Sequence, residues 1–192
     1  PSDCLAAMLH QELPDATHLQ LAFKSSHMKI SPGTAKTVLE SLALGGQVRR
    51  NGQLETAPLG SVTAVIPFSD GPAVAVQIPW GDVVTAYYST GIPNIEVYMG
   101  IPPRDLRRMR FARRFRPFLA WAPVQSMLKN WVTRHVEGPT SEQRALEEVR
   151  LYGEVWNRRG QRVAMAMKTP GSYNLTVDAA LSAVVHVLEG SV

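Results

Sequence analysis

The turn from Ser31 to Thr34 combines residue types that suit the binding of an anion at the start of a helix. Ser31 is a favoured N-cap residue, and Pro32 and Gly33 follow it at the first helical positions. Free backbone N–H groups and the positive end of the helix dipole favour a carboxylate, phosphate or enolate oxygen at such a point. Lys36 lies near enough to assist an anion. The alternative is an ordinary capped helix with a solvated lysine.

A second group of polar and aromatic side chains lies between two predicted strands, within residues 72–101. Its members are Trp80, Asp82, Tyr87, Ser89 and Thr90. Asp82 is a good N-cap for a short helix, and the group as a whole is predicted at strand ends, where binding sites often lie. Trp80 and Tyr87 would line an apolar substrate pocket, or they would belong to the core, as aromatic side chains beside strands often do. Ordinary loop and capping chemistry accounts equally well for the group.

Other residues that often carry chemistry give weaker patterns. Asp3 is well placed to cap the first helix. Cys4, the single cysteine, lies near that helix start, where a thiol pKa can be lowered, but no histidine partner is obvious in the sequence. We therefore expect a half-buried structural thiol. The histidines show no ligand spacing, so no metal is expected; they are His10, His18, His27, His135 and His186.

A basic segment stands out in an otherwise nearly neutral chain. Residues 104–116 carry a local charge of +6 out of a total of +4, which leaves −2 for the remainder. The arginines are Arg104, Arg107, Arg108, Arg110, Arg113, Arg114 and Arg116, and the single acid is Asp105. A solvated face whose long stems cover apolar surface is one reading.

The other reading of this basic segment is a dock for something anionic. A phospholipid surface, an acidic partner such as a carrier protein, or an acidic substrate tail would fit. Nearby aromatic residues favour contact with a membrane surface: Phe111, Phe115, Phe118 and Trp121. No nucleic-acid recognition motif accompanies the charge, so nucleic acid is not expected as a partner.

Several motifs of common enzymes are missing from the sequence. There is no Gly-x-Gly-x-x-Gly, P-loop, His-Glu-x-x-His, Gly-x-Ser-x-Gly or Tyr-x-x-x-Lys. Without a glycine-rich phosphate cradle, the chain is not expected to bind a dinucleotide cofactor by itself. The residues alone also indicate no catalytic group.

Composition describes a globular protein of one domain, residues 1–192. Hydrophobic residues make up 45% of the chain and charged residues 19%. One cysteine excludes an internal disulfide framework and fits a reducing compartment, so a cytoplasmic location is expected, with membrane-peripheral attachment as an option. No apolar run approaches the roughly 20 residues of a membrane-spanning helix, and no signal peptide is visible. A start at Pro1 suggests a piece of something longer.

Hydrophobic periodicity predicts the elements that position these residues. In the first half we expect helices over 2–13, 32–44 and 82–90, the last of them short and closed by Gly91. We expect strands over 17–24, 62–66, 74–78 and 95–99. A hairpin over 48–56 would turn on Asn51-Gly52. In the second half we expect a helix from Pro103 that Pro117 breaks, a helix with Trp121, Val124, Leu128, Trp131 and His135 on one stripe, an exposed loop over 138–142, strands over 149–155 and 163–167, and a last helix capped by Thr176.

These elements predict an α+β fold. About eight strands, grouped as hairpins, favour a mainly antiparallel, mixed sheet, covered on one face by five or six helices, with the basic helical segment 102–137 inside the same domain. The late hairpin from Leu146 to Met167 would expose a long edge, which predicts a homodimer through this hairpin. The alternative is that the helix after Thr176 covers the edge.

Four segments resemble one enzyme family. Residues 78–99, IPWGDVVTAYYSTGIPNIEVYM, resemble the C-terminal half of saccharopine dehydrogenase-like oxidoreductases. The start, Pro1 to Leu5, resembles the end of a family segment that joins the nucleotide-binding domain to the substrate domain. The turn from Ser31 to Ala35 is similar to a Ser-x-Gly-Thr turn of the family, and the helix after Tyr173 resembles its late helix.

This resemblance implies a function and a fold. The chain would be the substrate-binding and dimerisation domain, with a sheet of the glyceraldehyde-3-phosphate dehydrogenase type. A Rossmann domain on its N-terminal side would bind NAD or NADP, and Asp3 would lie at the cleft between the two domains. The substrate would be a carbonyl, an imine or an enoyl-type double bond. The competing class is a non-catalytic interaction module that uses the basic helix to bind an anionic membrane surface or an acidic partner.

Overall fold

The computed structural model describes residues 1–26, 29–57, 60 and 62–191, and for residues 42–44, 112–113 and 116–117 it describes the backbone alone. His27 therefore lies outside the described residues. The side chains of Leu42, Arg113 and Arg116 lie outside them as well.

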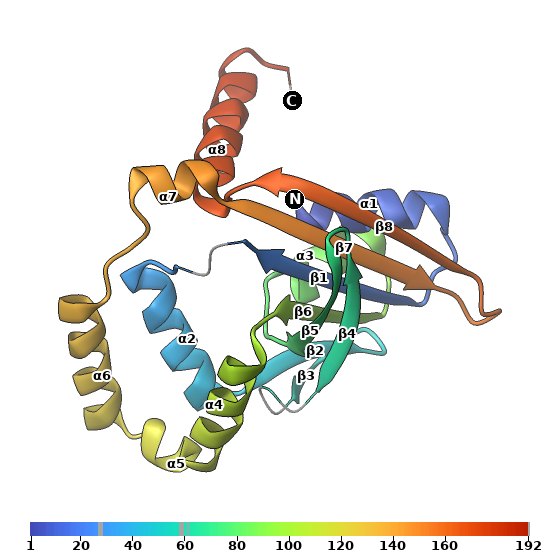
Figure 1. The fold of residues 1–192 in the computed structure, drawn as a ribbon. Helices are drawn as coiled ribbons and strands as arrows, with labels where there is room; N and C mark the ends of the chain where they lie inside the picture. Colours follow the sequence, from blue (N-terminus) through green and yellow to red (C-terminus); the bar gives the residue numbers. More distant parts are fainter. Residues whose placement is uncertain (27–28, 58–59, 61, 192) are drawn as a thin grey trace.

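The described strands form a single mixed sheet, as the alternating apolar patterns predict (Figure 1). The strands are β1 (His18–Ser25), β2 (Gly46–Arg50), β3 (Gln53–Ala57), β4 (Thr63–Phe68), β5 (Gly71–Gln77), β6 (Asn94–Gly100), β7 (Glu148–Trp156) and β8 (Arg162–Pro170). The main path runs β3-β2-β6-β1-β7-β8, and β5 joins β4 to the C-terminal end of β6. Only β1 and β6 pair in parallel among these strands. The predicted α+β class with a mainly antiparallel sheet is confirmed.

Eight helices surround this sheet in the described part of the chain, more than the predicted five or six. They are α1 (Ser2–Glu12), α2 (Pro32–Leu44), α3 (Asp82–Thr90), α4 (Pro103–Arg114), α5 (Arg116–Leu119), α6 (Ala122–His135), α7 (Ser141–Leu146) and α8 (Ser172–Leu188). The additional elements, α5 and α7, are each shorter than two turns, too short for a periodic pattern to show. None of the described helices combines enough length with enough apolar character to cross a bilayer.

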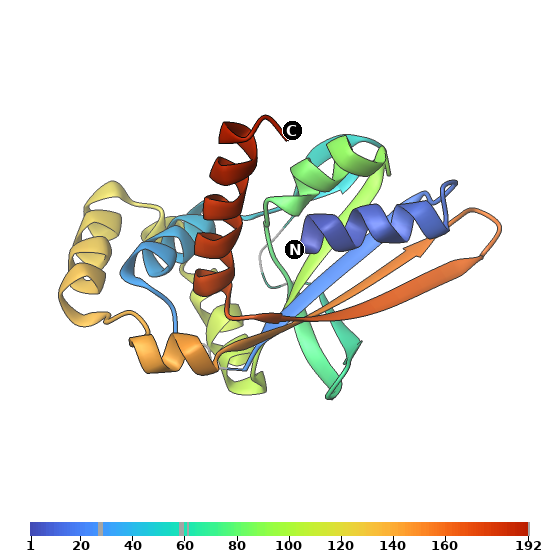
Figure 2. The same cartoon turned by 90° about the horizontal axis from the view of Figure 1, so that it is seen from above.

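The main core lies between α1, α3 and one face of the sheet (Figure 2). Leu5 and Leu9 of α1 are fully buried against inward-facing residues of β1 and β7. The inward residues of β1 and β6 alternate, as in Leu19 and Leu21, because successive side chains of a strand point to opposite faces. α1 thereby packs mainly over β7 and β8, and α3 packs over β6.

The opposite face of the sheet is covered only in part. The β4–β5 hairpin folds over it and buries a smaller cluster that includes Ala22, Phe68 and Tyr98. The rest of this face carries charged side chains from β1, β7 and β8, which pair with one another or with Asp70 of the β4–β5 turn. The two faces therefore differ sharply in polarity.

Some helix boundaries differ from the sequence-based predictions. Gly81, not Asp82, is the N-cap of α3, and Asp82 is the first helical residue. The segment 138–142, predicted as an exposed loop, contains the start of α7, where Thr140 and Gln143 form a capping box. The last helix begins at Ser172, with Gly171 as its N-cap, and so starts before the predicted cap Thr176. Gly91 does adopt the predicted left-handed conformation, with φ of 70°.

Some predicted helix faces also differ. Trp131 is exposed because α6 contacts the body on one narrow side, where Val124 and Val132 are buried. Cys4 is exposed and not half-buried, because the buried side of α1 runs through Leu5 and Leu9.

The helix α8 extends away from the end of β8 and has no buried residue (Figures 1 and 2). It therefore does not cover the outer edge of β8 in the single chain. Its exposed apolar residues include Leu181 and Val184.

Candidate functional site

The N-terminus of α2 meets the start of α8 through Tyr173. Ser31 caps α2 as predicted, since its hydroxyl accepts a hydrogen bond from the Thr34 N–H at 3.2 Å. The Ser31 N–H donates to the Tyr173 hydroxyl at 2.9 Å. The Thr34 hydroxyl lies 3.4 Å from the same phenolic oxygen. Two predicted site residues and one additional residue, Tyr173, thus form one polar cluster.

This environment changes the acidity of Tyr173. Burial favours the neutral phenol, but the hydrogen bonds from Ser31 and Thr34 outweigh it and lower the pKa of Tyr173 below its ordinary value. The Ser31 N–H occupies one lone pair of the phenolic oxygen, so the phenol keeps its own proton to donate. Tyr173, with its lowered pKa, is therefore the candidate for proton exchange in this cluster.

The chain around Tyr173 is tightly fitted. A Cβ on Gly171 would lie 2.8 Å from Cβ of Glu147, so only glycine allows this close approach. Glu147 is buried and accepts a hydrogen bond from the Ser25 hydroxyl at 2.6 Å. The C-terminal end of β1, the start of β7 and the start of α8 are thereby fixed together. No sequence pattern points directly to Tyr173, apart from its place before the predicted late helix.

The other predicted residues of α2 have no polar partner that would indicate a role. Gly33 is exposed in the first turn, and a Cβ there would have ordinary contact with Ser31. Lys36 is half-buried two residues beyond Thr34 and makes no ion pair within the described residues. It remains close enough in sequence to serve an anion at the helix start.

A second cluster joins the beginning of α1 to α3. The Ser89 hydroxyl donates to Asp3 Oδ1 at 3.0 Å. Asp82 is buried, and this burial raises the pKa of its carboxyl; the Asp3 carboxylate adds to the rise, while a hydrogen bond from Ser2 opposes it. Asp3, Asp82 and Ser89, predicted from separate positions, therefore do lie together.

The aromatic residues and Thr90 are used differently. Trp80 is 45% exposed and packs against Phe23 with ring centroids 4.9 Å apart. The guanidinium of Arg49 lies 4.0 Å from the ring centroid of Tyr87, which also packs on the main core. Thr90 is buried, and its hydroxyl bonds the Ala86 carbonyl at the end of α3. Trp80 is the member of this group that offers free aromatic surface.

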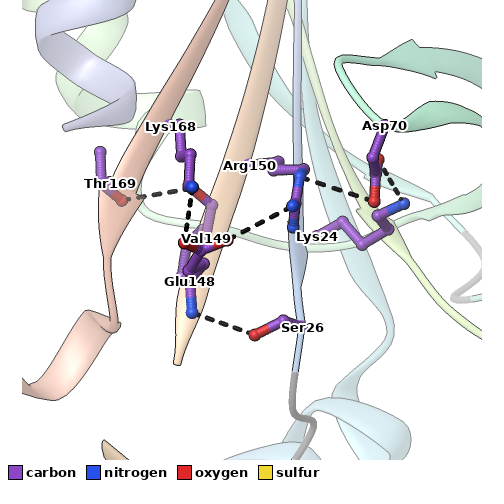
Figure 3. Close-up of polar contacts among 8 residues, drawn as sticks. All are labelled: Lys24, Ser26, Asp70, Glu148, Val149, Arg150, Lys168 and Thr169. Atoms are coloured by element: carbon purple, nitrogen blue, oxygen red, sulfur yellow. Dashed lines mark hydrogen bonds and ion pairs between the residues drawn. The ribbon is translucent and has the colours of Figure 1, made fainter. Parts of the chain in front are cut away.

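A chain of alternating charges crosses the outer face of the sheet (Figure 3). Asp70 lies between Lys24 at 2.8 Å and Arg150 at 3.5 Å. Arg150 also pairs with Glu148 at 3.3 Å, and Glu148 pairs with Lys168 at 2.5 Å. This ion chain joins the β4–β5 turn to β1, β7 and β8. Sequence reasoning did not find it, because its members are far apart in the chain.

The ion chain also affects acidity. The hydrogen bond from Lys24 lowers the pKa of Asp70, and the hydrogen bond from Lys168 lowers the pKa of Glu148. Arg150 contributes to both shifts by charge attraction. The folded state therefore favours the charged forms of Asp70 and Glu148, and the ion chain holds the β4–β5 turn against the sheet.

The basic arm, which we define as α4, α5 and α6, places the predicted arginines on the surface. Arg104, Arg107, Arg108, Arg110 and Arg114 are exposed. Asp105 lies 3.3 Å from Arg108 and 3.8 Å from Arg104. The remaining described arginines of α4 form no ion pair within the described residues.

A surface hollow of about 410 Å³ lies elsewhere, at the N-terminal ends of β1 and β6. Its lining includes His18, Asn94 and Arg158. None of the predicted site residues lines it. No group of three or more histidine, cysteine, aspartate or glutamate side chains within the described residues is arranged to hold a metal ion.

Comparison with known proteins adds no assignment. No protein-family model matches the chain, and no curated protein matches its sequence.

Proposed function

We propose that the chain is the substrate-binding and dimerisation domain of an NAD(P)-dependent oxidoreductase of the saccharopine dehydrogenase-like type. The observation that supports this is how the four resembling segments meet. The segment from Pro1 to Leu5 joins residues 78–99 through Asp3 and Ser89. The turn from Ser31 to Ala35 joins the start of the late helix through Ser31 and Tyr173. Figures 1 and 2 both place the start of α1 on the side of the sheet from which α8 extends.

The residues of this chain do not suit the dinucleotide itself. The sequence has no glycine-rich turn between a strand and a helix, which is the usual cradle for a pyrophosphate. The coenzyme, which supplies hydride chemistry when bound, would be held by a Rossmann domain on the N-terminal side of Asp3. The role of this chain is then to hold the substrate and to supply the proton that the substrate gains when it is reduced.

Tyr173 is the proposed proton donor. A carbonyl oxygen, an imine nitrogen or the α-carbon of an enoyl group must gain one proton when the substrate is reduced, and the phenol O–H would supply it. The resulting phenolate would be stabilised by the N–H of Ser31 and the hydroxyl of Thr34. Trp80 would provide apolar surface for the substrate, and Lys36 would attract an anionic group.

Calorimetry with NADH and NADPH tests whether the coenzyme binds outside residues 1–192. Residues 1–192 should bind neither coenzyme, whereas the parent protein, extended to its natural N-terminus, should bind one of them. Binding to residues 1–192 with a micromolar Kd, about −8 kcal/mol, would contradict the assignment. A parent sequence without Gly-x-Gly-x-x-Gly upstream of Asp3 would also count against it.

The assignment of Tyr173 needs a separate test in the parent enzyme. Replacement Tyr173→Phe should lower kcat by roughly 10²–10⁴, the usual range for a lost general acid, and leave coenzyme affinity unchanged. Tyr88→Phe, which removes the hydroxyl of an exposed tyrosine on α3, is the matched control. Equal activity of the Tyr173→Phe enzyme and the control would exclude the proposed role.

A further inference from the structure

The basic arm carries exposed aromatic residues at the bend between its helices. Figure 1 shows α4 and α6 joined by the short α5, with α6 beside α2. Between 46% and 67% of the surface is exposed for each of the residues Phe111, Phe115, Phe118 and Trp121. The rings form close pairs, with centroids 5.2 Å apart for Phe111 and Phe115 and 6.5 Å for Phe118 and Trp121. We call these four residues the aromatic tip.

The arm is attached to the body by its other side. Leu106 and Met109 of α4 pack against the main core. In α6, the Gln125 side chain donates to the Leu39 carbonyl at 3.3 Å, and Lys129 pairs with Glu40 at 2.6 Å. The contacts with α2 fix the arm, so the exposure of the aromatic tip is a property of the fold.

Three arginines of α4 lie on the same helix face as Phe111 of the aromatic tip. Arg107, Arg108 and Arg114 stand four, three and three residues from Phe111, a spacing that places side chains on one side of a helix. The side chains of Arg104 and Arg108 are 74% and 79% exposed. Asp105 is the single acidic residue among residues 104–116. The face is therefore both cationic and aromatic.

We propose that this face docks on the surface of a bilayer that contains anionic lipid. Charge complementarity identifies the occupant, because the local charge of +6 suits a layer of phosphate headgroups. Aromatic rings are favoured at the boundary between headgroups and acyl chains, which an aqueous acidic protein surface does not offer. The arginines contact phosphates while the aromatic tip enters the boundary. This docking is independent of the proposed catalytic role.

Vesicle sedimentation of the whole chain tests the docking. The protein should sediment with vesicles of phosphatidylcholine and phosphatidylserine at low salt, and be released as salt rises. Vesicles of phosphatidylcholine alone should retain much less. If the protein ignores phosphatidylserine vesicles at low salt, the proposal is wrong. Retention on immobilised polyglutamate without retention on vesicles would indicate an acidic protein as the partner and would also overturn it.

Two variants with the same net charge distinguish binding through the basic arm from attraction by the overall charge of the protein. Arg107→Gln with Arg114→Gln should weaken vesicle binding roughly thirtyfold, since each basic residue near such a surface contributes about 1 kcal/mol. Arg158→Gln with Arg159→Gln, both exposed in the β7–β8 turn, should weaken it far less. Equal losses in the two variants would show that no particular face docks.

The aromatic tip has its own test. Phe118→Ser with Trp121→Ser should reduce vesicle retention at least tenfold, whereas Val65→Ser, which changes an exposed apolar residue of β4, should leave it unchanged. Brominated lipids should quench the fluorescence of Trp121, and Trp121→Phe should remove that quenching. Circular dichroism of each variant confirms that it is folded. Full retention by the Phe118→Ser, Trp121→Ser variant, together with no quenching of Trp121 in the wild-type protein, would refute insertion of the tip.

Discussion

Gly153 of β7 lies directly beneath Leu9 of α1. A Cβ added to Gly153 would stand 2.5 Å from Cδ1 of Leu9 and 3.1 Å from Cδ2 of Leu5. Non-bonded carbon atoms do not approach so closely, so the buried leucine side chains, or α1 itself, would have to shift. The absence of a side chain at Gly153 thus sets the distance between α1 and β7.

We therefore predict that Gly153→Ala destabilises the fold. Overpacking of a core typically costs about 1–3 kcal/mol, and both leucines are fully buried. Chemical denaturation measures the loss. Gly81→Ala is the matched control, because Gly81 has an ordinary φ of −54° and no atom within 4 Å of the added carbon. An unchanged denaturation midpoint for Gly153→Ala would mean that α1 packs more loosely than described.

The ion chain predicts a loss of stability in acid. The lowered pKa values of Asp70 and Glu148 mean that the folded state favours their charged forms. Their contribution to stability is complete above the ordinary carboxyl pKa of about 4, and it is lost as pH falls through the lowered values. Asp70→Asn should therefore reduce stability at neutral pH, and the difference from wild type should shrink to nothing in strong acid.

Denaturation curves over this pH range provide the measurement. Glu55→Gln is the control, since Glu55 and Arg50 are 3.7 Å apart and about half exposed, and such pairs contribute little. A difference between Asp70→Asn and wild type that stays constant with pH would show that charge is not its cause.

The tyrosines should ionise in a defined order. The pKa of Tyr173 is lowered, whereas burial and Glu96 raise the pKa of Tyr98. Absorbance titration of the phenolates should therefore lose its earliest step in Tyr173→Phe and its latest step in Tyr98→Phe. Loss of a late step in Tyr173→Phe would contradict the cluster with Ser31.

Local patterns in the sequence were sufficient for much of the fold. The alternation of Leu19 and Leu21 identified β1, and Asn51-Gly52 identified the hairpin of β2 and β3. Only long-range pairing decides that β1 lies parallel to β6 and antiparallel to β7. The predicted apolar stripe on α6 is wrong at Trp131, which is exposed. Periodicity gives the direction of a helix face but not the width of the surface that covers it.

The candidate site was predictable only where it depends on contacts that are local in sequence. Capping rules identified Ser31 correctly, since its partner Thr34 is local in sequence. Tyr173 lies 142 residues from Ser31, and no local rule connects them. The pairing of Asp3 with Ser89 likewise depends on the packing of α1 against α3.

The structure also changes how dimerisation should be tested. From the sequence, Val163 and Met165 are the natural positions for a charge that would disrupt a dimer through the late hairpin. In the structure, however, both pack on the main core beneath α1. A charge at either position would disturb the fold of the single chain. Ala164 and Ala166 alternate with them and are exposed on the other face of β8. These two alanines are therefore the proper sites.

We predict that the chain forms a symmetric dimer through the outer edge of β8. That edge pairs with no strand within the described residues, and α8 does not cover it. Unpaired N–H and C=O groups on a nine-residue strand invite a second copy, and one edge is enough for a two-fold contact. Light scattering at micromolar concentration should give twice 21.1 kDa. Ala164→Lys with Ala166→Lys should give the monomer mass, whereas the control Val65→Lys on β4 should keep the dimer mass. A wild-type mass of 21.1 kDa at every concentration would disprove the dimer.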